Sequence, residues 1–265
     1  MTANGVDILG SRAYALICAH DGITARELAR QLGATRREVN QLLYRYPFIH
    51  DLCYHDDEYR WYGLIHQGFP HEGLADYCGW YGDVSDFLAL DEEAWLQQLV
   101  EGCGRIGRNV NDTRGVIHSF TDARLVMRGL FADLKEFGAE CDDWELAFEV
   151  RIKRAKWVRI YADVLVVVPG AGYAPSPDPR QGFAFSLEFK MKDAVDPEEV
   201  AQAAKYAPYL GVVLGADFRV IPALVLTRAS DLFCRERDPR TKAPVAVASG
   251  DMLFNVFDEH LGLLG

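Results

Sequence analysis

The sequence predicts an α/β (α+β) protein in which a small helical N-terminal domain precedes a larger mixed β-sheet flanked by helices. Two helices with capping residues lie near the N-terminus, and three apolar, strand-like segments lie in the second half. The second half has the order helix, three strands, helix, strand, which is typical of a sheet covered by helices. A chain of 265 residues is long enough for one small and one medium domain.

Residues 1–64 are expected to form the N-terminal domain, from three helices and a β-hairpin. The first helix is predicted over residues 11–20, an apolar segment. Two short helices follow, and residues 48–64 then predict two strands around the acidic turn 56–58. Two helices joined by a Gly-containing turn form a helix-turn-helix, and the hairpin would be its wing.

The second and third helices are predicted from their capping residues. Thr24 with Glu27, and Thr35 with Glu38, each have the spacing of a capping box. In a capping box the first side chain accepts a hydrogen bond from the backbone, and the Glu side chain accepts one in return. Gly33 between the two boxes is expected to end the first of these helices.

Residues 65–90 are expected to be a connector, and residues 91–265 a second domain. The connector is rich in glycine, aromatic and acidic residues, and its aromatics indicate that it packs on a domain. In the second domain, helical periodicity and capping residues predict helices at 91–102, 121–136, 196–210 and 250–261. Apolar runs predict strands at 145–152, 158–168, 182–190 and 219–227.

Charged residues interrupt two of these apolar strands. Asp163 lies within one strand, and Glu188, Phe189 and Lys190 end the next. Side chains of a strand alternate between its faces, so Glu188 and Lys190 should share a face while Phe189 enters the opposite layer. Charges among apolar residues cost free energy unless they are paired or bind a metal. Two carboxylates and a lysine suit a divalent cation that activates water against a phosphodiester.

The formal net charge of −11 argues against a nucleic-acid partner, but the charge is unevenly distributed. Residues 65–100 contain seven acidic residues and neither Lys nor Arg, whereas residues 151–159 contain five cations. Local patches decide phosphate binding, so Lys153, Arg154 and Lys156 are candidates to contact nucleic acid. The alternative interpretation of this run is a solvated hairpin turn.

The order of elements, with Asp163 on the second strand and Glu188-x-Lys190 on the third, resembles the PD-(D/E)XK nuclease superfamily over residues 115–230. Gln202 and Tyr206 share a helix face and resemble the Gln-x-x-x-Tyr pattern of its RecB-like branch. The resemblance implies a restriction-endonuclease-like sheet. It also implies that Asp163, Glu188 and the Phe189 carbonyl would ligate Mg²⁺, with Mn²⁺ as a substitute. Lys190 would orient or deprotonate the attacking water, and Gln202 and Tyr206 would support the site. The alternatives are a surface ion pair for Glu188 with Lys190 and an ordinary amphipathic helix for Gln202 with Tyr206.

The resemblance also implies a further group on the preceding helix. Asp133 and Glu136, near the end of that helix, are the candidate acids. His118 is a third candidate, because residues 115–118 are similar to a Gly…His element of RecB-like members, although the spacing is one residue short.

A second resemblance concerns the N-terminal domain. Thr24-Ala25-x-x-Leu28-Ala29-x-x-Leu32-Gly33, the following helix and a tryptophan on the second wing strand are similar to the Z-alpha winged helices, which bind left-handed duplexes. The resemblance implies that Arg36, Asn40, Tyr44 and Trp61 would face nucleic acid. The wing tip here is acidic where the family has proline, which favours general duplex binding over left-handed specificity. A protein–protein module is the alternative.

These observations predict a cytoplasmic, Mg²⁺-dependent nuclease with a winged-helix domain that recognises duplex nucleic acid. We favour DNA over RNA as the substrate, and a role in bacterial defence or DNA processing. A homodimer is compatible with double-strand cutting, which needs two sites. The N-terminus lacks the pattern of a signal peptide, no apolar run is long enough to span a membrane, and the six cysteines are scattered singly. The alternative is a non-catalytic, nucleic-acid-binding regulator or adaptor with an inactive nuclease fold.

Overall fold

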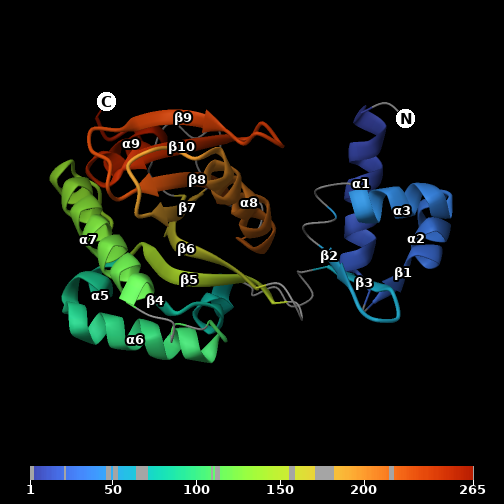
Figure 1. Cartoon of the computed structure of the whole chain (residues 1–265), viewed down its shortest axis with the longest axis horizontal. Helices are drawn as coiled ribbons and strands as arrows, with labels where there is room; N and C mark the ends of the chain where they lie inside the picture. The colour runs from blue at the N-terminus through green and yellow to red at the C-terminus, as the bar shows by residue number, and fades with distance from the viewer. Residues whose placement is uncertain are drawn as a thin grey trace. The chain divides into compact units, whose positions relative to one another are not determined.

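The computed structural model describes residues 3–20, 22–45, 49, 53–63, 71–108, 110, 114–154, 159–170, 182–214 and 218–264. The chain divides into two compact units, Met1–Phe69 and Pro70–Gly265, whose elements are labelled in Figure 1. Helices and sheets occur in both, so the protein has the predicted α+β class. Within the described part of the chain, no helix has the length and apolar character needed to cross a membrane.

The N-terminal unit is a set of helices packed beside a small sheet. Its elements are α1 (Ala3–Cys18), β1 (Ile23–Thr24), α2 (Ala25–Leu32), α3 (Arg36–Arg45), β2 (Cys53–His55) and β3 (Arg60–Gly63). The sheet order is β1-β3-β2, and both pairings are antiparallel. The predicted hairpin is therefore present, and β1 adds a third strand to it. The first helix begins at Ala3, eight residues earlier than the apolar pattern predicts.

Both predicted capping boxes are confirmed. The backbone N–H of Thr24 donates to Glu27 Oε2 (2.9 Å), and that of Glu27 donates to Thr24 Oγ1 (3.3 Å). Thr35 and Glu38 make the same pair of bonds, at 2.8 and 3.3 Å. Gly33 ends α2 with a left-handed backbone (φ 66°), which glycine adopts without steric cost.

Asp56 organises the tip of the β2–β3 hairpin. Its Oδ1 accepts hydrogen bonds from the backbone N–H groups of Glu58 and Arg60, and its Oδ2 accepts from the Arg60 guanidinium and the Tyr62 hydroxyl. Desolvation alone would raise the pKa of Asp56, but the hydrogen bonds from Arg60 and Tyr62 outweigh it and lower the pKa to about 2. This wing-tip acid thus has a structural role in the turn.

The C-terminal unit is built on one seven-stranded sheet. Its helices are η2 (His71–Tyr77), α5 (Val84–Ala89), α6 (Glu92–Arg105), α7 (Arg114–Glu136), α8 (Pro197–Leu214), η3 (Gly250–Met252) and α9 (Leu253–Leu261). Its strands are β4 (Trp80–Asp83), β5 (Glu145–Arg154), β6 (Arg159–Val168), β7 (Gly182–Lys190), β8 (Phe218–Leu226), β9 (Phe233–Arg237) and β10 (Pro244–Ser249). The strand order is β4-β5-β6-β7-β8-β10-β9; β7, β8 and β10 run parallel, and the other neighbours are antiparallel.

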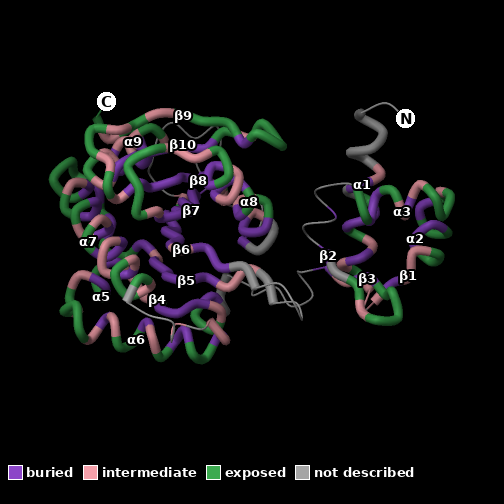
Figure 2. Tube along the Cα trace, viewed as in Figure 1, coloured by how far each residue is buried: buried purple, intermediate pink, exposed green. Residues whose placement is uncertain are grey.

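The central strands of this sheet are buried along most of their length (Figure 2), because helices cover both faces. One face packs against α5, α6, α7 and α9 and receives Leu187 and Phe189 of β7. The other face packs against α8, whose Val200, Ala203 and Ala204 contact apolar residues of β8 and β10. Phe189 therefore points into the layer opposite α8, as its position in the strand predicts.

Three predicted boundaries differ from the structure. The segment expected to be a connector contributes η2, β4 and α5 to the large unit, and Trp80 of β4 pairs with Phe148 of β5. Helix α7 begins at Arg114, so Thr121 lies inside it, and α8 continues past Pro208 to Leu214. Strands β9 and β10 were not predicted. Residues of β10 pair with strands on both sides, so tertiary pairing determines this strand.

Candidate active site and nucleic-acid interface

A fork between two strands creates the candidate active site. Strands β6 and β7 pair from Val168 and Phe183 to Val164 and Leu187, where their described pairing ends. Strand β7 continues along β8 as far as Lys190, which pairs with Leu226. The next residues of the two separating strands are Asp163 and Glu188, so the carboxylates lie where the sheet opens.

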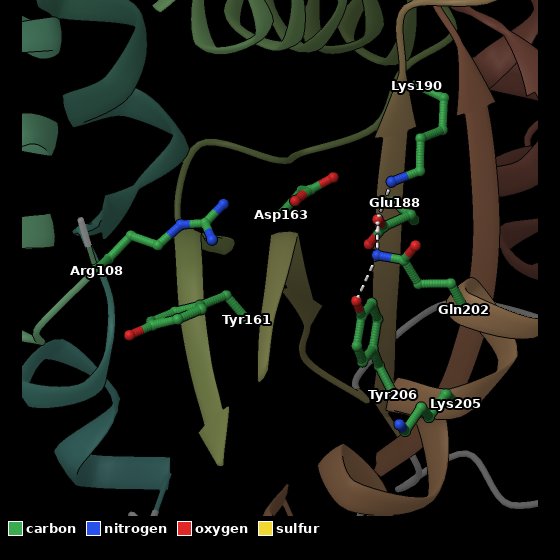
Figure 3. A pocket seen from close by; sticks show the side chains of 8 residues that line it. All are labelled: Arg108, Tyr161, Asp163, Glu188, Lys190, Gln202, Lys205 and Tyr206. Atoms are coloured by element: carbon green, nitrogen blue, oxygen red, sulfur yellow. Dashed lines mark hydrogen bonds and ion pairs between the residues drawn. The ribbon is translucent and has the colours of Figure 1, made fainter. Parts of the chain in front are cut away.

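An open pocket of about 350 Å³ occupies this region (Figure 3). Side chains from α8, both strands of the fork and the segment after α6 line it. They are Arg108, Tyr161, Asp163, Glu188, Lys190, Gln202, Lys205 and Tyr206. The five residues predicted from sequence to be catalytic are all among them.

Asp163 of β6 accepts a hydrogen bond from the backbone of the neighbouring strand β7. Its Oδ2 accepts a hydrogen bond from the backbone N–H of Phe189 (2.8 Å). Because β6 and β7 diverge here, the carboxylate provides a partner for an N–H group at the point where the ladder ends. Burial raises the pKa of Asp163, although this hydrogen bond and the charges of Lys190 and Arg108 oppose the shift.

Glu188 is the centre of the polar network. Its Oε1 accepts hydrogen bonds from Lys190 Nζ (2.7 Å) and from Gln202 Nε2 (2.6 Å), while its Oε2 is buried and has no hydrogen-bond partner. Gln202 Nε2 also lies 2.9 Å from the Tyr206 hydroxyl, to which it donates. Gln202 and Tyr206 are one turn apart on α8, which places both beside Glu188.

The ionisable groups of the pocket have shifted pKa values. Burial, together with the charge of Asp163, raises the pKa of Glu188 to about 8, although Lys190 opposes the shift. Desolvation would lower the pKa of Lys190, but its contact with Glu188 outweighs this effect and the pKa is raised. Ionisation of the buried carboxylates is thus costly, and a cation bound beside them would reduce that cost.

Glu149, which the sequence analysis did not select, adds a third buried carboxylate. It lies on β5, between residues that pair with Val164 and Ala162 of β6, and therefore opposite Asp163. Burial and the charge of Asp163 raise the pKa of Glu149 to about 8, although Arg108 opposes the shift. Its backbone is left-handed (φ 54°), which costs about 1–3 kcal/mol for a residue other than glycine. Such strained positions cluster at functional sites.

The chemistry of the pocket fits a hard divalent cation. Asp163 and Glu188 supply carboxylate oxygens, and the unpartnered Glu188 Oε2 is a free acceptor. Oxygen ligands of this kind are those that Mg²⁺ and Mn²⁺ prefer. Across the described residues, however, no three His, Cys, Asp or Glu side chains are arranged at metal-binding spacing. A cation here would therefore rely on two carboxylates with backbone or water oxygens.

The candidates on α7 do not reach this pocket. His118, Asp133 and Glu136 are absent from its lining, and α7 packs on the sheet face opposite α8. Among the predicted basic contacts, Lys153 and Arg154 are the last residues of β5, and their side chains lie outside the described atoms. Lys156 lies outside the described residues altogether.

The N-terminal unit brings all four of its predicted contact residues to one pocket. Arg36, Asn40 and Tyr44 of α3 line it with Trp61 of β3, in a volume of about 440 Å³. The Tyr44 ring is 48% exposed and meets the buried Trp61 ring edge-on at 5.2 Å. Five further residues line the same pocket: Thr24, Ala25, Arg26, Glu58 and Tyr59.

Some of the overlooked residues in and beside the pocket of the C-terminal unit carried a sequence signal. Tyr161 precedes Asp163 by two residues, so the two share a strand face, and Lys205 follows Gln202 by three, so they share a helix face. Glu149 interrupts an apolar strand just as Asp163 does, and the same argument would have selected it. Arg108 carries no such signal, because only tertiary packing brings the end of α6 to β6.

Comparisons with known proteins give no match. The chain matches no protein-family model, no curated protein and no solved structure.

Proposed function

We propose that the protein is a metal-dependent nuclease that hydrolyses phosphodiester bonds, with DNA as its favoured substrate. The observation that carries the proposal is the single pocket in which Asp163, Glu188 and Lys190 meet Gln202 and Tyr206. Two buried carboxylates with raised pKa values beside a lysine are unusual in a purely structural site. The open form of the pocket supports access by an extended strand.

In this proposal Lys190 acts as a cation and hydrogen-bond donor. Its raised pKa keeps the ammonium group charged at neutral pH, which favours stabilisation of phosphate charge over proton abstraction. The side chain is 24% exposed, so it remains accessible to a substrate while Glu188 fixes its position. Lys190 would donate to a phosphate oxygen or orient the incoming water.

Asp163, Glu188 and the carbonyl of Phe189 would hold the divalent cation. When bound, Mg²⁺ or Mn²⁺ would lower the pKa of a water molecule and neutralise charge on the phosphate. Gln202 fixes the Glu188 carboxylate from α8, and Tyr206 in turn positions the Gln202 amide. These two residues are positioning groups whose hydrogen bonds leave Glu188 Oε2 available.

The N-terminal unit would contact duplex nucleic acid through its own pocket. Arg36 supplies charge for a phosphate, Asn40 supplies an amide, and the exposed Tyr44 ring supplies a surface for a base or sugar. Glu58 at the rim would repel phosphate, but its carboxylate pairs with the Arg60 guanidinium at 3.2 Å. The proposal assigns general duplex binding to this unit.

Cleavage assays test the proposal directly. Plasmid, linear duplex, single-stranded DNA and RNA are incubated with Mg²⁺, Mn²⁺ or EDTA, and the products are resolved on gels. We expect metal-dependent cleavage that falls at least 100-fold in Glu188→Gln and in Lys190→Ala. Glu199→Gln is the matched control, because Glu199 is a neighbouring acid that pairs with Lys192 and does not line the pocket.

Two results would contradict the proposal. Undiminished cleavage by Glu188→Gln would show that this pocket does not catalyse the reaction. Tight nucleic-acid binding without cleavage of any substrate would instead identify a non-catalytic, nucleic-acid-binding regulator.

A further inference from the structure

Arg108 enters the pocket of the C-terminal unit from a segment that is firmly attached to the sheet. The backbone N–H of Arg108 donates to the Cys103 carbonyl at 2.8 Å, which continues the end of α6. The carbonyl of Ile106 accepts hydrogen bonds from the Arg151 guanidinium (3.1 Å) and the Tyr161 hydroxyl (3.5 Å). Hydrogen bonds from β5 and from β6 therefore hold the segment that carries Arg108 against the sheet.

Two further contacts fix the side chain of Arg108. Its Nε lies 2.8 Å from Glu149 Oε2, and the Glu149 side chain is only 5% exposed. Its guanidinium carbon lies 4.9 Å from the centre of the Tyr161 ring, a cation–π distance. Figure 3 shows the guanidinium extending toward Asp163, from the side of the pocket opposite Lys190 and Gln202.

The contacts of Arg108 fix the direction of its guanidinium, which neutralising the charge of Glu149 would not by itself require. The guanidinium is planar, and a partner at Nε leaves its outer nitrogens free to donate to another anion in a fixed direction. The side chain is 35% exposed, so an incoming anion can reach it. Arg108 and Lys190 thus place donors on two sides of the open fork.

We propose that Arg108 binds a phosphate of the nucleic-acid strand in this pocket, and that Glu149 and Tyr161 position its guanidinium. The inference deepens the proposed function and depends on it for the choice of ligand. Glu149 is a positioning residue here, since it acts through Arg108. The strained backbone of Glu149 is then explained, because it directs the carboxylate toward the arginine.

Binding of a short single strand tests this role in the full-length protein. The probe is a fluorescein-labelled 12-nucleotide DNA strand, with Ca²⁺ in place of Mg²⁺ and with strand integrity checked on a denaturing gel. Affinity is measured by anisotropy at several salt concentrations for the wild type, Arg108→Ala, Arg108→Lys, Glu149→Gln and the Arg108→Ala/Glu149→Gln double variant. Arg105→Ala is the control, because Arg105 is an exposed cation one turn earlier that does not line the pocket.

We expect Arg108→Ala to weaken binding about tenfold and to reduce the slope of log affinity against log salt by about 0.7, the value for one phosphate contact on a single strand. Arg108→Lys should keep the slope but lose part of the affinity, because an ammonium cannot reproduce the fork geometry. Arg105→Ala should match the wild type. Circular dichroism melting verifies that each variant is folded.

The sign of the Glu149→Gln effect separates positioning from simple repulsion. If Glu149 positions Arg108, Glu149→Gln should bind the DNA strand more weakly than the wild type. The double variant should then bind no more weakly than Arg108→Ala alone. Tighter binding would mean that Glu149 only repels the strand, and a further loss in the double variant would mean that it acts independently of Arg108. Either result overturns its assigned role, and an unchanged slope in Arg108→Ala overturns the phosphate contact. A wild type that binds but never cleaves would refute the proposed hydrolysis while leaving the Arg108 contact intact.

Discussion

Replacing Glu188 by glutamine should stabilise the metal-free protein at neutral pH, although the same change should abolish cleavage. Glu188 is 1% exposed, and its folded-state pKa is about 8 against an ordinary value of 4.5. The folded state therefore binds more protons than the unfolded state between these values, so the free energy of unfolding falls as pH rises through this window. Glutamine has nearly the same shape and no charge to desolvate.

The two pKa values set the size of the effect. At 1.36 kcal/mol per unit, the rise in the pKa of Glu188 from 4.5 to about 8 on folding costs about 4 kcal/mol of stability at pH 7.5 and about 1 kcal/mol at pH 5.5. The charges of Asp163 and Glu149 also affect the pKa of Glu188, so we expect a net gain of about 2–4 kcal/mol for Glu188→Gln at pH 7.5. For a unit of this size, that gain corresponds to an increase of about 5–15 °C in Tm.

Calorimetric melting in EDTA from pH 4.5 to pH 8 measures this difference. The Tm values of the wild type and Glu188→Gln should nearly coincide at the acidic end and separate as pH rises. Glu199→Gln again serves as the control for the Glu-to-Gln substitution itself. Mg²⁺ should raise the Tm of the wild type more than that of Glu188→Gln, because the variant lacks one carboxylate ligand. Equal or lower stability of Glu188→Gln at pH 7.5 would refute the inference that this carboxylate is held at an energetic cost.

Two further predictions concern the N-terminal unit. Thr24→Ala removes the first capping box and should cost about 1 kcal/mol of stability in urea unfolding, whereas Thr24→Ser should be nearly neutral; an unchanged midpoint for Thr24→Ala would contradict the role of the cap. Tyr44→Ala should weaken binding of a labelled 20-base-pair duplex about tenfold and leave the affinity for the 12-nucleotide strand unchanged, since the exposed Tyr44 ring lines only the pocket of this unit. Tyr44→Phe is the matched control, and unaltered duplex affinity in Tyr44→Ala would argue for a protein partner instead.

Local sequence determined the elements whose stabilising contacts lie close together along the chain. The boxes of Thr24 with Glu27 and of Thr35 with Glu38 use residues three apart, so they could be identified before any tertiary contact was known. Asp196 likewise caps α8, accepting from the backbone N–H of Glu198 at 2.9 Å. The Glu199 carboxylate, three residues after this cap, pairs with Lys192 Nζ at 2.7 Å.

The edges of the sheet could not be predicted in the same way. Strand β4 has only four residues, and β9 is mostly exposed and polar, so neither has a distinct apolar pattern. Both exist because a longer neighbour, β5 or β10, offers backbone groups to pair with. Strand formation of this kind depends on the partner more than on the propensity of the segment itself.

The sequence by itself determined the α+β class, the paired helices of the N-terminal unit, and the grouping of Asp163, Glu188, Lys190, Gln202 and Tyr206. Strand alternation and helix periodicity paired the residues within each element, and the family resemblance implied that the elements share one site. Only the tertiary structure showed that Arg108 lines the same pocket and that Glu149 pairs with it. Both depend on contacts that the segment after α6 makes with β5 and β6, which follow it by about 40 residues or more. The physical reason is that long-range packing, and not local periodicity, selects which charges share a pocket.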